Sequence, residues 1–250
     1  MIEAIGLTKT YAGNSAPSVD NLSLTVPPGE LFGFLGPNGA GKTTTIKMLV
    51  GLLTPTGGTA KVAGFDMKTQ SLEAKKRIGY IPDNPFLYEK LTGREFLEFI
   101  GDLYDIAPGK EREAEIDRLL TMQQLASSGD KLIGGYSRGM RQKMAMAAAL
   151  LHEPTVLFLD EPTVGLDPSS IRRLKDVLRE LCRTKNTSVF LSTHTLEVAA
   201  EICDRVGIFH RGKLIALGSP AELTSTSKSG GLEEVFLEMT ASAAEETAPS

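Results

Sequence analysis

The chain has 250 residues, of which 41% are hydrophobic and 23% are charged. At roughly 150 residues per domain, this length suits one large domain or two small ones, and the apolar share supports a sizeable core. The composition excludes a disordered, collagen-like or low-complexity chain. The formal net charge of −4 disfavours a dedicated binder of nucleic-acid phosphates, because such proteins are usually strongly basic.

The cysteine content, the N-terminal residues and the length of the apolar runs indicate where the chain is located. Cys182 and Cys203 cannot by themselves form a disulfide framework or a four-ligand zinc site, so we expect two reduced thiols. Met1–Ile5 contains an early acid and lacks the pattern of a secretory signal. The longest apolar run, Met144–Leu151, is less than half of the ~20 residues that cross a bilayer. We expect a soluble chain whose membrane role comes through a partner.

Short apolar runs alternate with amphipathic stretches along the chain, which predicts an α/β fold with a partly parallel sheet. Gly29 is a predicted turn between the second and third strands. The first three strands are predicted at Ile2–Leu7, Leu22–Val26 and Leu31–Leu35.

A glycine-rich segment separates the third strand from the first predicted helix, Lys42–Leu53. Its sequence, GPNGAGKT, fits the phosphate-loop pattern G-x-x-x-x-G-K-[ST]. Glycines let successive backbone N–H groups turn inward around phosphate oxygens, and the helix N-terminus adds partial positive charge. We expect Lys42 to reach the β- and γ-phosphates and the Thr43 hydroxyl to ligate Mg²⁺. The sequence therefore predicts a nucleoside-triphosphate site at Gly36, Pro37, Asn38, Gly39, Ala40, Gly41, Lys42, Thr43 and Thr44.

The pattern of alternation changes after the next two strands. Gly57–Gly58 is a predicted turn, and Thr59–Val62, the helix Ser71–Lys76 and the strand Arg77–Ile81 follow. From about residue 86 to 152 only helical periodicity remains, which indicates a helical subdomain inserted into an α/β core. Its predicted helices are Gly93–Tyr104, with Thr92 and Glu95 as a capping box, Glu111–Met122 and Gly139–Leu151.

Thr155–Leu159 is a continuous apolar run, as expected of a strand buried on both faces of a parallel sheet. It ends in Asp160 and Glu161, whose side chains should diverge because successive residues alternate along a strand. We expect Asp160 to face the metal and Glu161 to orient or deprotonate the attacking water. The alternative is a charged strand end without a role.

The last part of the chain returns to alternating elements. The helix Pro168–Arg183 has Asp167 as its N-cap and a proline in its first turn. The other predicted elements are the strands Ser188–Ser192, Arg205–His210 and Lys213–Leu217, the turn Arg211–Gly212, and the helices Leu196–Ile202 and Ala221–Leu223.

The order of these motifs resembles the nucleotide-binding subunit of ATP-binding cassette (ABC) transporters, from about Ile2 to Met239. The family's signature is usually Leu-Ser-Gly-Gly-Gln, and the corresponding stretch here is Tyr136–Met140, YSRGM. The resemblance implies a P-loop NTPase core with a mixed, mostly parallel sheet, an antiparallel β subdomain and an all-helical subdomain. We expect a core at residues 1–85 and 153–240, a helical subdomain at 86–152 and, from its Ala/Ser/Glu-rich composition, a flexible tail at 241–250.

Within that signature, Ser137 and Gly139 are the positions that match the family. A hydroxyl and an N–H at a helix N-terminus make an anion site. The resemblance implies that this site closes over the γ-phosphate held by a second copy of the chain. Without the resemblance, Ser-x-Gly before a helix is equally well an ordinary cap.

Three further positions carry over from the family. His194, after a strand, resembles the switch histidine that contacts the γ-phosphate, although a lone histidine is more often structural. Tyr11 resembles the aromatic residue that stacks on adenine, with a plain strand-edge tyrosine as the alternative. Gly165–Asp167 resembles the loop that crosses the dimer interface.

Asp83 is a departure from the family, which usually has a glutamine after the strand Arg77–Ile81. An aspartate accepts a hydrogen bond from a metal-bound water, but it is shorter and charged, with Mg²⁺ and Lys42 offsetting repulsion from the other acids. Asp83 is therefore included with Thr43 and Asp160 in the expected metal site. Its combination with YSRGM resembles the exporter-type branch with separate membrane subunits.

The resemblance implies an ATPase that uses ATP and Mg²⁺ to energise transport through a separate transmembrane permease, on the cytoplasmic face of the cell membrane. Two copies, identical or closely related, would form a head-to-tail dimer, and a groove near Asp83–Leu91 would receive the permease. Glu161, His194 and Lys42 are the implied catalytic residues. The alternatives are an ABC-type ATPase acting on nucleic acid or ribosomes, which the net charge disfavours, and a small-molecule kinase.

Overall fold

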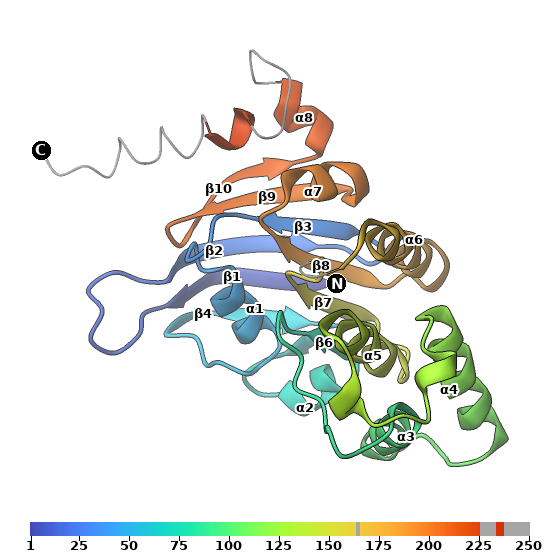
Figure 1. The fold of residues 1–250 in the computed structure, drawn as a ribbon. Helices are drawn as coiled ribbons and strands as arrows, with labels where there is room; N and C mark the ends of the chain where they lie inside the picture. The colour runs from blue at the N-terminus through green and yellow to red at the C-terminus, as the bar shows by residue number, and fades with distance from the viewer. Residues whose placement is uncertain (164–165, 226–233, 238–250) are drawn as a thin grey trace, which may run out of the picture.

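Two β-sheets organise the chain, as Figure 1 shows. The structure is a computed structural model that describes residues 1–163, 166–225 and 234–237. The smaller sheet is antiparallel, with the strand order β2-β1-β4-β5. Its strands are β1 (Ile2–Lys9), β2 (Val19–Val26), β4 (Gly57–Val62) and β5 (Phe65–Asp66).

The larger sheet has six strands in the order β10-β9-β3-β8-β7-β6, and every pairing except β10 with β9 is parallel. Strands β3, β7 and β8 are buried at every position, which is why they are continuous apolar runs. Their carboxyl ends meet at one edge, the place where parallel α/β sheets bind ligands. The strands are β3 (Leu31–Leu35), β6 (Ile78–Ile81), β7 (Val156–Asp160), β8 (Ser188–Thr193), β9 (Arg205–His210) and β10 (Lys213–Gly218).

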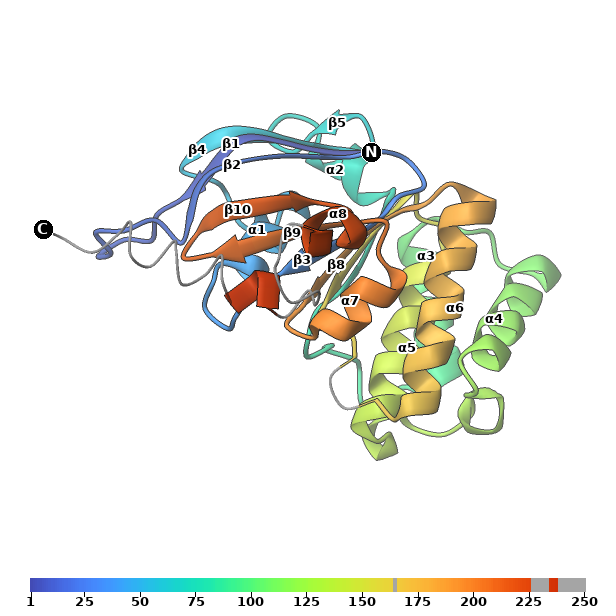
Figure 2. The ribbon, with the colours of Figure 1, turned by 90° about the horizontal axis from the view of Figure 1, so that it is seen from above.

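The longer helices α3 to α6 gather beside the sheets, as the view from above in Figure 2 shows. Between β6 and β7 the described chain forms helices and turns but no named strand. The helices are α1 (Lys42–Leu49), α2 (Ser71–Lys75), α3 (Gly93–Leu103), α4 (Lys110–Met122), α5 (Arg138–Leu150), α6 (Pro168–Lys185), α7 (Leu196–Ile202) and α8 (Pro220–Ser225), with 3₁₀ turns at Ala126–Ser128 and Ile133–Gly135.

A cluster of phenylalanines fills the space between the two sheets. The ring centroid of Phe190 lies 5.4 Å from that of Phe32, 5.2 Å from Phe34 and 5.6 Å from Phe158, and Phe209 lies 4.7 Å from Phe34. Apolar residues of β1, β2 and β4 belong to the same cluster. The two sheets are therefore held together by this core, which fixes β3, β7 and β8 beneath the site.

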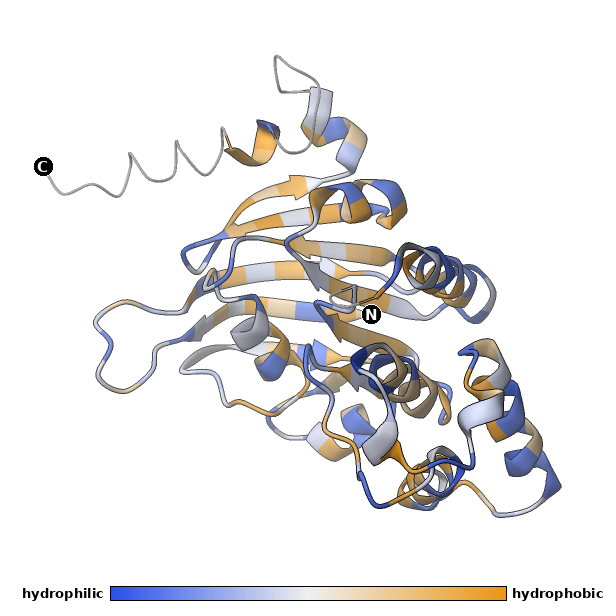
Figure 3. Cartoon of the chain, viewed as in Figure 1, coloured by the Kyte–Doolittle hydropathy of each residue, from blue (hydrophilic) through white to orange (hydrophobic). Residues whose placement is uncertain are grey.

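A second apolar cluster joins the opposite face of the large sheet to the helices. Leu157 and Leu191 from the sheet share it with Leu97 of α3, Met144 of α5 and Leu178 of α6. Figure 3 shows the corresponding hydrophobic strands and helix faces. Because one core runs across the sheet and the helices, the division into a core and a helical subdomain stays a prediction.

The α/β fold class with a mostly parallel sheet is confirmed, and so are the capping box of α3 and the Asp167 cap of α6. Helix α1 ends at Leu49 and not at Leu53 as predicted, because Gly51 takes a left-handed φ of 71°.

Glycine-containing turns gave mixed outcomes. The predicted turns at Gly29 and Arg211–Gly212 are present with positive φ angles. The predicted turn at Gly57–Gly58 is wrong, because these residues begin strand β4 and extend its pairing with β1 to Thr8 across a register shift. Sequence patterns also missed the two-residue strand β5 and both 3₁₀ turns.

Several expectations concern the ends and the surface of the chain. Cys182 and Cys203 are free thiols. No helix in the described part of the chain combines the length and the apolar character that a membrane span requires. The predicted flexible tail at 241–250 lies outside the described residues.

Replacing Phe190 tests the core between the sheets. Phe190→Ala removes a fully buried ring that contacts three others, and we expect it to lower the free energy of unfolding by about 3–5 kcal/mol. Phe86→Ala is the matched control, because Phe86 is 88% exposed and its loss should change stability by less than about 0.5 kcal/mol. Urea unfolding measures both, and equal effects would contradict this description of the core.

Candidate functional site

The glycine-rich loop between β3 and α1 has a backbone that only glycine allows at two points. Gly41 has a φ of 110°, and a Cβ there would lie 2.2 Å from the carbonyl oxygen of Ser18. A Cβ on Gly36 would lie 2.3 Å from the carbonyl oxygen of Phe209. The loop therefore packs against Ser18, just before β2, and against Phe209 near the end of β9. Sequence patterns did not reveal Ser18 as a neighbour of the loop.

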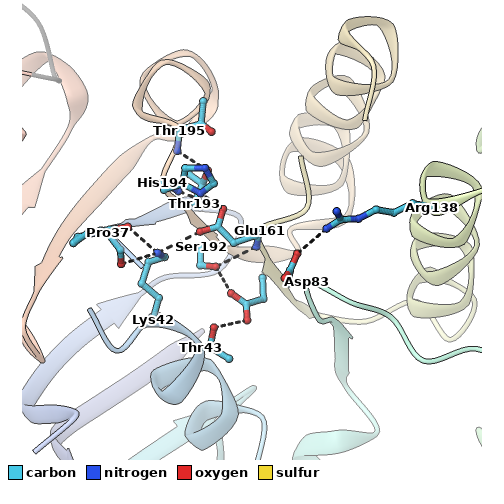
Figure 4. Close-up of polar contacts among 12 residues, drawn as sticks. Pro37, Lys42, Thr43, Asp83, Arg138, Glu161, Ser192, Thr193, His194 and Thr195 are labelled. Atoms are coloured by element: carbon cyan, nitrogen blue, oxygen red, sulfur yellow. Dashed lines mark hydrogen bonds and ion pairs between the residues drawn. The ribbon is translucent and has the colours of Figure 1, made fainter. Parts of the chain in front are cut away.

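Lys42, the first residue of α1, is 6% exposed and points back into its own loop. Its Nζ donates to the carbonyl oxygens of Gly36 at 2.7 Å and Pro37 at 3.2 Å, and it lies 3.3 Å from Oε1 of Glu161 (Figure 4). A buried ammonium group at the start of a helix provides a strong site for an anion.

Asp160 is 2% exposed at the end of β7 and ties three elements together. Its two carboxylate oxygens accept hydrogen bonds from Thr43 Oγ1 at 2.8 Å and from Ser192 Oγ at 2.5 Å. Ser192 faces Asp160 because β7 and β8 pair in that register. No sequence pattern pointed to Ser192, because its role follows from strand pairing.

Glu161 leaves the strand with a φ of 51°, which a glutamate rarely adopts. Its Oε2 lies 2.8 Å from Nδ1 of His194 and accepts from the backbone N–H of His194 at 3.3 Å. Its own N–H donates to Ser192 Oγ at 3.2 Å and to the Ser192 carbonyl oxygen at 3.1 Å. The carboxylate is 12% exposed and lies between Lys42 and His194, so it diverges from Asp160 through this backbone turn rather than through strand alternation.

The donor set at Thr43 and Asp160 fits a magnesium ion. Both supply hard oxygen atoms, and Mg²⁺ in nucleotide sites is usually held by one or two protein oxygens together with phosphates and waters. Among the described residues, no three His, Cys, Asp or Glu side chains are grouped to hold a metal by themselves. The negative charge of Asp160 also acts on Tyr80 of β6, where burial first and this carboxylate second raise the pKa of the phenol to about 12.

A cavity of about 250 Å³ opens above the phosphate loop. Asp83 and Glu161 line this cavity together with the loop, although Asp83 follows β6 and Glu161 follows β7. Its lining consists of Ser18, Pro37, Asn38, Gly39, Gly41, Lys42, Thr43, Thr44, Asp83 and Glu161. Most of the residues predicted to bind phosphate therefore face one cavity.

Tyr11 lies at the side of this cavity and is not part of its lining. Its hydroxyl is 3.4 Å from Thr44 Oγ1, and Lys9 Nζ lies 5.5 Å from its ring centroid. The ring is 38% exposed. Its predicted contact with adenine stays a prediction.

Ser137 and Gly139 lie at the start of α5, and neither lines the cavity of their own chain. The Ser137 Oγ accepts from the N–H of Met140 at 3.3 Å, which is the ordinary capping role. Its O–H hydrogen remains available to a second acceptor. Gly165, of the predicted interface loop, lies outside the described residues, and Asp167 caps α6.

Comparison with known proteins decides the family. The profile described as ABC transporter matches residues 19–164, more than half of the chain. The chain belongs to the ABC transporter family. The phosphate loop and the Asp160–Glu161 pair of this ABC protein lie within the matched residues, and the resemblance found from the sequence is confirmed.

Named relatives of this ABC protein are ATP-binding subunits. It is 41% identical over 215 residues to the bacitracin transport ATP-binding protein BcrA of Bacillus licheniformis, covering 86% of this chain and 68% of that one. It is 43% identical over 227 residues to the daunorubicin/doxorubicin resistance ATP-binding protein DrrA of Streptomyces peucetius, covering 90% and 67%. The chain is thus an ATP-binding subunit of the ABC transporter type.

Solved structures agree with this assignment. The ATP-binding subunit of an ABC transporter superposes with a TM-score of 0.88 at 31% identity, covering 96% of this chain and 99% of that one. A dimeric ATP-binding cassette in a post-hydrolysis state, bound to ADP and Pi, gives a TM-score of 0.79 at 25% identity, covering 88% and 98%. The ABC ATPase fold of this chain is therefore established.

The two loop glycines Gly41 and Gly39 provide a test of the phosphate-loop geometry. Gly41→Ala combines a positive φ with a clash against the backbone of Ser18, and we expect it to lower the free energy of unfolding by more than about 2 kcal/mol. Gly39→Ala keeps the positive φ but meets nothing within 4 Å, so it should cost only about 1 kcal/mol. Denaturant unfolding compares them, and a smaller effect for Gly41→Ala would contradict the described packing.

Proposed function

We propose that this ABC subunit binds ATP with Mg²⁺ and hydrolyses ATP to drive export through a separate transmembrane partner. The observation that carries the proposal is the bridging position of Glu161, whose carboxylate lies between Lys42 and His194 at the wall of the phosphate-loop cavity. A negative group already held by these two side chains occupies the kind of place that a terminal phosphate requires.

Nucleotide binding would use the loop and the buried acid. Backbone N–H groups of the loop would bind the phosphates of ATP, and Lys42 would exchange its contacts with the carbonyls of Gly36 and Pro37 for contacts with phosphate oxygens. Thr43 and Asp160 would hold the magnesium ion, which neutralises phosphate charge when bound. Asp83, on the same cavity, is the third expected contact, through a metal-bound water.

Hydrolysis would begin once the γ-phosphate takes over the contacts that hold Glu161. Lys42 and His194 would then bind phosphate oxygens, and the freed carboxylate would accept a proton from the attacking water. The same two side chains would stabilise the negative charge that develops on the transferred group. In this scheme the unusual φ of Glu161 places its carboxylate beside the phosphate instead of beside Asp160.

A second copy of the chain would complete the site. Ser137 and Gly139 would close over the γ-phosphate bound by the partner copy, and Tyr11 would stack on adenine. Ser137 and Gly139 lie outside the cavity of their own chain, which supports an intermolecular role for these two residues. A similar cassette, described above, is dimeric with ADP and Pi bound.

The transmembrane partner would dock on an exposed group of aromatic side chains, which we call the aromatic surface: Phe86, Tyr88 and Phe99. Phe86 is 88% exposed and Tyr88 is 50% exposed, and Phe99 is 40% exposed. The Tyr88 ring stands edge-on to both others, at 6.2 Å from Phe86 and 5.3 Å from Phe99. Contiguous apolar exposure of this kind marks an interaction surface. The relatives named for drug transport and resistance favour export from the cytoplasmic face.

Glu161→Gln is the direct test of hydrolysis. The amide cannot accept the proton of water, so turnover should fall by at least about 100-fold, while ATP binding persists and a dimer accumulates. Phosphate release and light scattering with ATP measure these effects. Glu113→Gln, an exposed change on α4, is the matched control. Wild-type turnover by Glu161→Gln would refute the role of Glu161.

The aromatic surface is tested by Phe86→Ala, with Leu72→Ala as control because Leu72 is 67% exposed on α2. Tagged chains are purified from detergent-solubilised membranes, and the hydrophobic polypeptides that accompany them are identified. We expect one such polypeptide to be retained by the wild type and by Leu72→Ala and to be lost with Phe86→Ala, at unchanged thermal stability. Equal retention by both variants would place the docking surface elsewhere.

A further inference from the structure

One ion pair connects the start of α5 with the cavity described above. Arg138, the first residue of α5, lies with Nη2 3.4 Å from Oδ1 of Asp83, 55 positions earlier in the chain. Figure 4 shows this contact crossing from the helix to the segment after β6. Arg138 stands where the family signature usually has glycine, and Asp83 stands where the family usually has glutamine, so both charges are departures from that pattern.

Asp83 is the third carboxylate at the proposed phosphate site, after Asp160 and Glu161. Asp160 has its charge satisfied by two hydroxyl donors, and Glu161 by Lys42 and His194. Asp83 lines the same cavity, and its counter-ion is Arg138. Without that counter-ion, a full negative charge would face an incoming polyanion across the cavity.

The pair contributes little to folding stability, because the side chains of Arg138 and Asp83 are 59% and 52% exposed and solvent screens them. A nearby arginine on the same helix behaves differently. Arg141 lies 2.9 Å from Glu89 and also donates to the carbonyl oxygens of Tyr136 and Gly134. Arg141 is therefore anchored within its own region, away from the cavity lining, whereas Arg138 acts on a residue of the cavity.

We propose that Arg138 is a positioning residue for nucleotide binding that acts through Asp83. It holds the Asp83 carboxylate toward α5 and neutralises it, so that the cavity admits the phosphates of ATP. The inference rests on the proposed function, since it takes ATP to be the ligand of this cavity. Because like charges repel over several ångströms even in a partly solvated site, losing Arg138 exposes ATP to Asp83, and removing Asp83 as well cancels that loss.

A double-mutant cycle on the full chain tests this coupling. ATP affinity is measured by calorimetry in EDTA, so that no metal contributes, for the wild type, Arg138→Gln, Asp83→Asn and the double variant. We expect Arg138→Gln to weaken binding about five-fold at low salt and much less at 0.5 M salt. The double variant should bind ATP like Asp83→Asn alone, because Arg138 has no carboxylate left to neutralise, so the two effects are non-additive.

Two further variants separate charge from structure. Arg138→Lys keeps the positive charge and should bind like the wild type, and Arg141→Gln should do so because Arg141 does not face the cavity. Additive effects in the cycle, or wild-type affinity for Arg138→Gln, would overturn the inference and leave the proposed function intact. A wild-type chain that binds no ATP would instead overturn the proposed function, and this inference with it.

Discussion

The site depends on the burial of one carboxylate. Asp160 is almost inaccessible, and a buried charge is very costly unless its oxygens receive hydrogen bonds. Thr43 and Ser192 supply those bonds from α1 and β8. The phosphate loop, the acidic strand and the strand that leads to His194 are thereby fixed relative to one another before any nucleotide arrives, which is the preorganisation that a phosphoryl-transfer site requires.

Two carboxylates that line the cavity have side-chain partners within the chain. Glu161 is held by Lys42 and His194, and Asp83 by Arg138. Under the proposed function, a nucleotide would replace the first set of contacts and leave the second in place. On this proposal, catalysis would require the release of Glu161, whereas binding would require Asp83 to stay neutralised.

Local sequence determines the parts that the patterns predicted. The GPNGAGKT loop, the apolar strands predicted at Leu31–Leu35 and Thr155–Leu159 and the cap at Thr92 follow from residue type and near-neighbour spacing. The structure places the second strand one residue later, at Val156–Asp160, and agrees with the others. Continuous apolar runs predicted these strands. Because strands buried on both faces require helices to cover the sheet, the alternation of such runs with amphipathic stretches also predicted the α/β class.

The features that escaped the sequence arise from contacts between distant segments. Ser192 meets Asp160 only through the pairing of β7 with β8. The approach of Ser18 to Gly41 and the contact of Arg138 with Asp83 depend on how separate elements pack. Composition predicted a turn at Gly57–Gly58, but pairing with β1 extends β4 through these residues.

Under the proposed function, a second copy of the chain completes the catalytic centre. The most direct measurement is the ATP turnover rate per chain as the protein is diluted through the range in which dimers dissociate. We expect the rate per chain to fall steeply on dilution, because an isolated copy would lack Ser137 and Gly139 of a partner over the phosphate. A rate per chain that is independent of concentration, in samples shown by light scattering to be single copies, would contradict it.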